Sequence, residues 1–287
     1  MINKIQHMTK QDKQLKNLFP EAIQKVAAEI FGEQSMQPVL LGLLSAPTSA
    51  TADLHPQADS SFWKMLHPKE AATLNGYKFP KRRSEYLTGR ICAKMAIREL
   101  LKLTTAQSIS PILSEIEIAR TENGRPDIFI HVPEAKAPKM EISISHSGDY
   151  GVAIATESPC GVDLQLQQAN LLRVQEKFCS AGEYSLLEMF LTDSDKIARL
   201  ALLWAAKEAA KKALSYWQMP GFLDLEVQKL TNLSNCIGLS LRLSPAKCRP
   251  MPEEVSVVAG MFGESAQYAL AICLINEERS NAGITRS

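Results

Sequence analysis

The chain has 287 residues, of which 45% are hydrophobic and 22% charged, and its formal net charge is +1. This composition is ordinary for a globular protein that can bury one large core or two moderate ones, and the balanced charge does not indicate nucleic-acid binding. Charged residues interrupt the early segment, so no signal peptide or membrane span is expected. The six cysteines have neither a C-x-x-C pair nor zinc spacing, and we expect buried, reduced thiols in a cytoplasmic protein.

The first 60 residues give weaker signals. The pattern predicts a helix over residues 14–31, a strand over 38–45 and a loop at 48–51. We interpret this part as an N-terminal extension that covers the first sheet.

A helix over residues 84–101 begins the next part, and alternating residues predict strands over 114–119, 127–132, 141–145 and 151–155. The basic cluster at residues 78–83 precedes the helix. It is compatible with a solvated helix start and equally with ligand binding.

His146 lies at a predicted strand end, between Ser145 and Ser147 and before a Gly148-Asp149 turn. Hydroxyls, an imidazole and a glycine-bearing turn can together donate hydrogen bonds to a phosphate. A single histidine in a hairpin is, however, more often only a turn residue.

A strand over residues 160–166 carries Asp163 on the face opposite Val162. Taken alone, such an aspartate is usually a surface residue. After it, Ser180 and Glu183 fit a capping box at the start of a helix, which by itself can explain Glu183.

The helix predicted over residues 197–217 is apolar on nearly every side, yet Glu208 and Lys212 extend its apolar stripe. Charges in such a position are costly unless they are paired or bind a metal or ligand. From this segment alone, an i,i+4 ion pair between the two residues is the more common explanation. Oxygen ligands from a strand and a helix, here Asp163 and Glu208, would suit Mg²⁺.

Strands predicted over residues 225–230, 238–243, 255–261 and 268–275 repeat the order seen after the first helix. We therefore expect an α+β fold of two similar helix-plus-antiparallel-sheet halves related by a pseudo-twofold axis, with the site in the cleft between them. The halves would comprise residues 1–157 and 158–287 and join near residues 157–161, with a polar tail at 276–287.

Four blocks of this sequence, in this order and spacing, resemble the 4′-phosphopantetheinyl transferase superfamily. The similarity is to its long type, which includes the surfactin-synthetase and enterobactin-synthase activators, and it extends over about residues 60–275. The blocks are residues 81–90, Gly124-Arg125-Pro126, Ser145-His146-Ser147, and Gly161-Val162-Asp163 with residues 178–183 and 204–212. Gly-Val-Asp followed by Trp-x-x-Lys-Glu-x-x-x-Lys is their most specific part.

The resemblance implies transfer of the phosphopantetheine arm of coenzyme A to a serine of an apo acyl or peptidyl carrier protein, with release of 3′,5′-ADP. The first half would contact the nucleotide and phosphates of coenzyme A, and the second half would carry the metal and catalytic residues. No nucleic acid or membrane partner is implied, and the chain is expected to be a monomer that forms a pseudo-dimer.

By the same resemblance, Asp163 and Glu208 match the Mg²⁺ ligands of the family. Glu183 matches an acid that holds a metal-bound water or acts as general base, and Lys212 matches the lysine at the pyrophosphate. Gln165 stands where many members have a second acid, so it would coordinate by its amide oxygen or through a water, and Mn²⁺ becomes an alternative to Mg²⁺.

His146 matches a contact to a coenzyme A phosphate, with Ser145 beside it. Arg83 and Arg125 are the candidates for the nucleotide phosphates, and Lys81 and Arg82 lie nearby in the sequence.

Two other functions fit parts of the pattern. Gln165 leaves open a coenzyme A-binding regulatory protein without transferase activity. The basic cluster leaves open a protein interaction module that binds neither metal nor coenzyme A.

Overall fold

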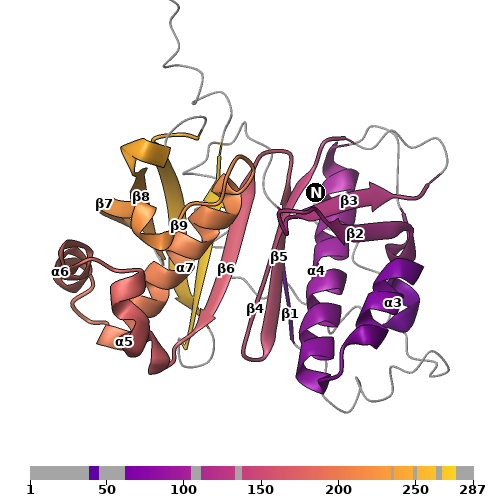
Figure 1. The fold of residues 1–287 in the computed structure, drawn as a ribbon, viewed down its shortest axis with the longest axis horizontal. Coiled ribbons are helices and arrows are strands. Elements are labelled where there is room, and N and C mark those ends of the chain that lie inside the picture. The colour runs from indigo at the N-terminus through magenta and orange to yellow at the C-terminus, as the bar shows by residue number, and fades with distance from the viewer. Residues whose placement is uncertain are drawn as a thin grey trace, which may run out of the picture.

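The computed structural model describes residues 39–44, 62–104, 111–132, 138–233, 236–247, 251–262 and 267–275. Two halves lie side by side, each with a long helix packed on an antiparallel sheet (Figure 1). Within the described ranges, no helix is both long and apolar enough to cross a membrane.

The first half contains a three-stranded sheet and a separate two-stranded sheet. The three-stranded sheet has the order β1-β5-β4 and the other consists of β2 and β3. Its elements are β1 (Val39–Leu44), η2 (Trp63–Met65), α3 (Pro68–Gly76), α4 (Pro80–Thr104), η3 (Leu113–Glu115), β2 (Ile116–Arg120), β3 (Pro126–Ile130), β4 (Glu141–Ser147) and β5 (Tyr150–Thr156).

The second half has one five-stranded antiparallel sheet of order β6-β10-β9-β8-β7. Its elements are β6 (Cys160–Leu166), α5 (Asn170–Val174), η4 (Gln175–Lys177), α6 (Ala181–Phe190), α7 (Lys196–Leu214), η5 (Phe222–Asp224), β7 (Leu225–Leu233), β8 (Cys236–Leu243), η6 (Pro245–Lys247), β9 (Glu254–Phe262) and β10 (Tyr268–Leu274).

Both halves share the order of a strand, a short helix, a long helix, a 3₁₀ turn and four strands, to which the first half adds η2 and the second half adds α5, η4 and η6. This confirms the expected α+β duplication. The strand expected at residues 38–45 exists as β1, but its role differs from the expectation. It pairs antiparallel with β5 and so belongs to the first sheet, where it corresponds to β6. The helix expected at 14–31, the loop at 48–51 and the tail at 276–287 lie outside the described residues.

Besides the short α5, helix α3 was not predicted from the sequence. His67 caps it by accepting a bond from the Lys69 amide at 3.4 Å, Pro68 occupies its first turn, and Glu70 completes a capping box. Serine, threonine, aspartate and asparagine are the usual N-cap residues, so a histidine in this position gave no signal.

Among the residues that the structure describes, buried apolar side chains form three clusters. Two of them lie beneath α4 and α7, and the third lies between the two halves. Strand alternation explains the division, because Ala153 and Ala155 of β5 face α4 while Val152 and Ile154 join the third cluster with Val162 of β6. Apolar packing therefore holds the halves together as well as each half by itself.

Serine hydroxyls bridge the two halves where β4 and β6 meet. The amides of Val162, Leu164 and Leu166 donate to the hydroxyls of Ser143, Ser145 and Ser147 at 3.0, 3.2 and 2.9 Å. Alternate residues of two edge strands are thus joined through side chains and not through a backbone ladder. Side chains from both halves can meet at this junction.

Candidate functional site

Asp163 lies at the junction of the halves, on β6, and is only 6% exposed. Its Oδ1 accepts bonds from the Lys212 ammonium at 2.6 Å and from the Ser145 hydroxyl at 2.7 Å. Burial raises the pKa of the Asp163 carboxyl, the Lys212 charge opposes that rise, and the negative charge of Glu208 adds to it. Asp163 is therefore a buried carboxyl group that contacts one cationic group, the Lys212 ammonium.

Lys212 reaches this point from α7, which Asp195 caps by accepting from the Ala198 amide at 2.8 Å. The ammonium also donates to the Val162 carbonyl at 2.9 Å, and the Ile144 carbonyl of β4 lies 3.5 Å away. Residues of both halves therefore surround one cationic group.

Gly161 allows α7 to approach β6 closely. A Cβ atom at this position would lie 1.9 Å from the Ala209 carbonyl oxygen and 2.8 Å from the Ala213 amide nitrogen. Only glycine permits that contact, and it brings the α7 face with Glu208 and Lys212 against the strand that carries Asp163.

Glu208 precedes Lys212 by four residues, so the two side chains share a face of α7. Its carboxylate bonds the Lys211 ammonium at 2.8 Å and keeps 23% of its side-chain surface exposed. The expected i,i+4 pair with Lys212 is replaced by an i,i+3 pair, because Lys212 binds Asp163. Burial is the larger cause of the raised pKa of Asp163, and the negative charge of Glu208 adds to it.

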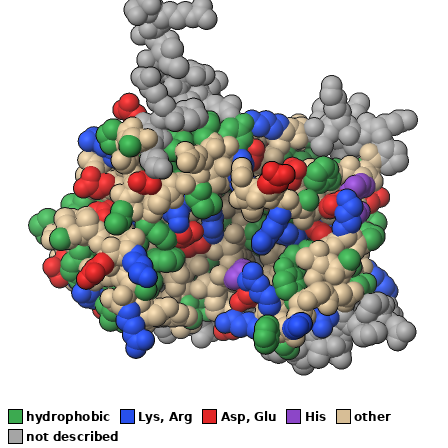
Figure 2. Space-filling model, in the orientation of Figure 1, with side chains coloured by type: hydrophobic (Ala, Val, Ile, Leu, Met, Phe, Trp, Pro, Cys, Tyr) green, Lys and Arg blue, Asp and Glu red, His purple; other side chains and the backbone are tan. Residues whose placement is uncertain are grey.

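A pocket of about 270 Å³ opens beside this group, and both halves line it. Figure 2 shows Lys, Arg and His side chains gathered where the halves meet. The lining consists of Tyr77, Arg82, Glu85, Tyr86, Gly89, Arg90, Arg120, Asn123, Gly124, Arg125, Pro126, Ile142, Ser143, Ile144, His146, Cys160, Lys212, Ser215 and Met219. Five cationic side chains, four arginines and one lysine, make the pocket suited to a polyanion.

His146 lines this pocket from the end of β4 and keeps 39% of its side chain exposed. Burial by the pocket walls lowers the pKa of the imidazole, Glu85 opposes that shift, and Arg82 and Lys212 add to it. Neutral imidazole keeps one ring N–H donor, which suits a phosphate oxygen.

The arginines predicted to bind the nucleotide have different positions. Arg125 lines the pocket, bonds Glu141 at 2.5 Å and lies over the Tyr216 ring at 5.0 Å. Arg83, the other arginine predicted to bind the nucleotide, is not among the residues that line the pocket, whereas Arg82 is. One residue along a helix turns the side chain by about 100°, so the sequence could not decide between them.

Ser145 was expected to contact coenzyme A but is buried, with its hydroxyl bonded to Asp163. Gln165 follows Asp163 by two residues and therefore shares its sheet face. Its amide nitrogen donates to the Leu166 carbonyl at 2.7 Å, which fixes one end of the side chain.

Glu183 was expected beside the metal ligands Asp163 and Glu208, but its hydrogen bonds and its ion pair are with other residues. It completes the capping box of α6 with Ser180, accepts the Val227 amide at 3.0 Å and pairs with Lys207 at 2.7 Å. Lys207 is 0% exposed, and its ammonium also donates to the Phe178 carbonyl at 2.8 Å. Burial lowers the pKa of Lys207, and Glu183 opposes that shift. Protein donors thus engage both oxygens of Glu183.

Several pocket residues were not predicted. Arg90 is 8% exposed and lies over the Tyr86 ring at 4.8 Å. Arg120 and Asn123 belong to the β2–β3 hairpin, beside Gly124, whose φ of 79° shapes the turn. The Gly124-Arg125-Pro126 block indicated this turn in the sequence. That Arg120 and Asn123 also line the pocket is visible only in the folded hairpin.

The donors at the junction fit a hard divalent cation. Asp163 and Glu208 offer carboxylate oxygens from facing elements, and Gln165 adds an amide on the Asp163 side. The buried Asp163 carboxylate already binds one cationic group, the Lys212 ammonium. Oxygen ligands of this kind suit Mg²⁺ or Mn²⁺ better than softer metals.

The fold and the site together define a protein of two repeated halves with a cationic pocket between them. Residues 56–158 match the family model of the 4′-phosphopantetheinyl transferase N-terminal region, and residues 159–273 match the model of the 4′-phosphopantetheinyl transferase superfamily. The chain belongs to this superfamily, in the long type that the sequence blocks indicated.

Two curated relatives support that membership. One is a holo-(acyl-carrier-protein) synthase of Geobacillus sp. (strain WCH70), 36% identical over 74 residues that make up 26% of this chain and 58% of the relative. The other is the 4′-phosphopantetheinyl transferase psf-1 of Bacillus pumilus, 28% identical over 193 residues, 65% of this chain and 69% of the relative. The matched stretch thus spans a little over half of the first relative.

Solved structures also resemble parts of the chain. An ACPS–CoA complex of Chronobacterium ammoniagenes is 21% identical, with a TM-score of 0.33 over 41% of this chain and 94% of that one. A holo-(acyl-carrier-protein) synthase of Helicobacter pylori in complex with coenzyme A is 22% identical, with a TM-score of 0.28 over 41% and 99%.

Proposed function

We propose that the protein transfers the 4′-phosphopantetheine group of coenzyme A to a serine hydroxyl of an apo acyl or peptidyl carrier protein and releases 3′,5′-ADP. The observation that carries this proposal is the contact between Asp163 and Lys212, at the junction that also holds a basic pocket. The activities named for the two relatives agree with it.

The pocket would receive the nucleotide part of coenzyme A. Its arginines can neutralise the 3′-phosphate and the pyrophosphate, and Arg guanidinium groups bind phosphates in a bidentate manner. His146 would donate a hydrogen bond to a phosphate oxygen, and Tyr86 and Met219 supply apolar surface for the base. Coenzyme A bound in this way would contact both halves.

Asp163 and Glu208 would hold a divalent ion, with Gln165 as a further oxygen ligand or through a water. When bound, Mg²⁺ supplies positive charge that offsets the charge of the pyrophosphate. The Lys212 ammonium bonds Asp163 Oδ1, so it would have to move from that oxygen when the ion binds. Its flexible side chain allows this movement, and the ammonium would then also offset charge on the pyrophosphate.

The reaction forms one bond and breaks one. The serine oxygen bonds to the phosphorus that carries the pantetheine arm, the bond from that phosphorus to the bridging oxygen breaks, and 3′,5′-ADP leaves with the electron pair. Lys212 stabilises the charge that develops on the phosphates, and the serine proton passes to a carboxylate at the junction. Glu208 is partly exposed there, whereas the oxygens of Glu183 are engaged by other groups.

We assign Glu183 to positioning. Its bonds to Lys207 and to the Val227 amide tie α6, α7 and β7 together, and α7 carries Glu208 and Lys212. We also infer a cytoplasmic monomer, since coenzyme A is found in that compartment and one chain supplies both walls of the pocket.

Intact mass measurement tests the proposal. The full chain is incubated with a panel of apo carrier proteins, coenzyme A and Mg²⁺, and the carriers should gain one phosphopantetheine group. Asp163→Ala should reduce the rate at least about 100-fold. Glu188→Gln removes a carboxylate on α6 that is 59% exposed and pairs with Arg199, and should not change the rate.

Coenzyme A binding without modification of any carrier would contradict the transferase proposal and favour a regulatory protein. Loss of activity on removal of Mg²⁺ and recovery with Mn²⁺ would support the oxygen-ligand site.

A further inference from the structure

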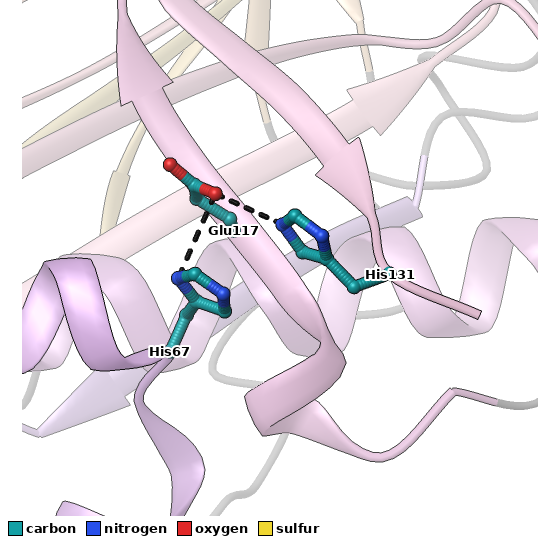
Figure 3. A group of neighbouring side chains, drawn as sticks. All are labelled: His67, Glu117 and His131. Atoms are coloured by element: carbon teal, nitrogen blue, oxygen red, sulfur yellow. Dashed lines mark hydrogen bonds and ion pairs between the residues drawn. The ribbon is translucent and has the colours of Figure 1, made fainter.

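A second group of possible ligands lies in the first half, outside the pocket lining. His67 precedes α3, Glu117 belongs to β2, and His131 follows β3 (Figure 3). Each offers one ligand atom, and these atoms lie within 4.8 Å of one another. It is the only such group of three or more among the described residues.

From this arrangement we propose that His67, Glu117 and His131 form a binding site for a divalent transition metal ion of the zinc type. Two imidazoles and one carboxylate are a common ligand set for such ions, with water in the remaining position. Mg²⁺ prefers oxygen ligands, so the site would differ in metal preference from the junction that holds Asp163.

The distances agree with a shared ion. Glu117 Oε2 lies 3.6 Å from His67 Nδ1 and 2.9 Å from His131 Nε2. Ligand atoms about 2.1 Å from a tetrahedral zinc lie about 3.4 Å apart. The first distance is near this value, and the second must lengthen as an ion enters. Small movements of the three side chains would therefore suffice.

The hydrogen bond made by His67 also bears on ligation. Its Nδ1 accepts the long 3.4 Å bond from the Lys69 amide, so this nitrogen carries a lone pair, which an ion would take from that amide. Glu117 Oε2 accepts a bond from the Lys69 ammonium at 3.1 Å and lies 2.9 Å from His131 Nε2, so this oxygen already faces a cationic group.

Several rearrangements are needed. His67 Nδ1 must release the Lys69 amide, and the His131 nitrogen that faces Glu117 must carry a lone pair. The imidazole rings stack with centroids 4.6 Å apart and an interplanar angle of 9°, and one ring must rotate because a metal lies in the plane of each ligating ring. His131 can do so, since its side chain is 45% exposed. Lys69 must release Glu117, which it binds at 3.0 Å, and its side chain is 71% exposed.

The location gives the site a structural consequence. β2 and β3 form a separate two-stranded sheet, and such a hairpin has little stability of its own. A bound ion would link both strands to the start of α3. Because this hairpin carries Arg120 and Arg125, the ion would also steady one wall of the pocket.

The test uses the full chain freed of metal with a chelator. Zn²⁺ binding is measured by calorimetry and Co²⁺ binding by the visible absorption of tetrahedral coordination. At free Zn²⁺ about 100 times the dissociation constant, Tm should rise by about 5 °C. Mg²⁺ should not compete for this site.

Two variants remove a ligand without harming the fold. His131→Asn changes an exposed side chain, and His67→Ser leaves a preferred N-cap for α3. Each should weaken Zn²⁺ binding at least about 100-fold, since even partners of ligands contribute about 10–100-fold. Lys69→Gln removes the competing cation and should tighten binding.

His146→Asn is the matched histidine control and should leave Zn²⁺ binding unchanged. Equal Zn²⁺ affinity and equal Co²⁺ spectra for the wild type, His131→Asn and His67→Ser would overturn the proposal, and so would a wild type that binds neither metal. Both results are independent of any measurement of transferase activity.

Discussion

The two halves share a buried ion pair but differ in the residues that follow it. In the first half Glu70 completes the capping box of α3, accepts the Ile118 amide at 3.1 Å and pairs with Lys94. In the second half Glu183 completes the capping box of α6, accepts the Val227 amide at 3.0 Å and pairs with Lys207. Both lysines are 0% exposed and donate to two backbone carbonyls.

After these equivalent lysines the two helices diverge. α7 continues with Glu208 and, five positions after the lysine, Lys212, whereas α4 has Met95 and Glu99 at those positions. The residues that repeat therefore build the fold, and the residues that occur in one half only are candidates for chemistry. By this criterion Glu183 belongs with the fold, and Glu208 belongs with the site.

The largest effects should come from the shared pairs. Lys94→Met and Lys207→Met each leave a buried glutamate without its ammonium partner, and each should lower the free energy of unfolding by about 3–5 kcal/mol and Tm by about 6–15 °C. Denaturant unfolding measures this. A large loss for one variant and none for the other would break the equivalence of the halves.

Gly161→Ala should have the next largest effect, and it is specific to the second half. The added Cβ would meet the backbone of Ala209, so α7 must move away from β6, at a cost of about 3 kcal/mol. Activity should fall further than stability because Lys212 moves with α7. Normal activity in a folded variant would show that this contact does not set the site.

Variants of two serines on β4 distinguish the stability of the contact between β4 and β6 from catalysis. Ser143→Ala and Ser145→Ala each leave one β6 amide without its partner, and each should cost about 1–3 kcal/mol of stability. Only Ser145 also bonds Asp163, whereas Ser143 lines the pocket. With saturating coenzyme A, Ser145→Ala should therefore reduce kcat beyond the loss of folded protein, and Ser143→Ala should act on coenzyme A binding instead. Equal kcat for the two variants would argue against a role for this bond.

The smallest effect concerns pH. The pKa of His146 lies below its usual 6.5, so the imidazole gains its proton only as pH falls below that value. The protonated ring attracts phosphate, and coenzyme A binding without divalent ions should tighten less than about tenfold across that range. His146→Gln should flatten this dependence, while Glu85, Arg82, Lys212 and Asp163 still face the site. An unchanged profile in the variant would assign the titration to another group.

Much of the fold follows from local patterns in the sequence. Alternation defined β6 at residues 160–166, and the capping box placed the start of α6 after Ser180. The position of β1 in the first sheet did not follow, because strand pairing over more than 100 residues is a property of the tertiary structure.

The site was predictable only in part. Asp163 and Lys212 meet because Gly161 lets two elements touch, and the Gly-Val-Asp block contained that glycine. Arg82 and Arg83 could not be separated, since helix rotation decides which one faces the pocket. The group formed by His67, Glu117 and His131 gave no signal because its members come from three elements with no common motif.

The most direct measurement compares kcat of Glu208→Gln and Glu99→Gln in carrier modification with saturating coenzyme A and Mg²⁺. Each glutamate lies on a long helix and pairs with the lysine three residues later, at 2.8 Å for Glu208 and 2.6 Å for Glu99. We predict a loss of at least about 100-fold for Glu208→Gln, no loss for Glu99→Gln and similar stability for both. Equal activity of the two variants would contradict the assignment of the metal site to the second half.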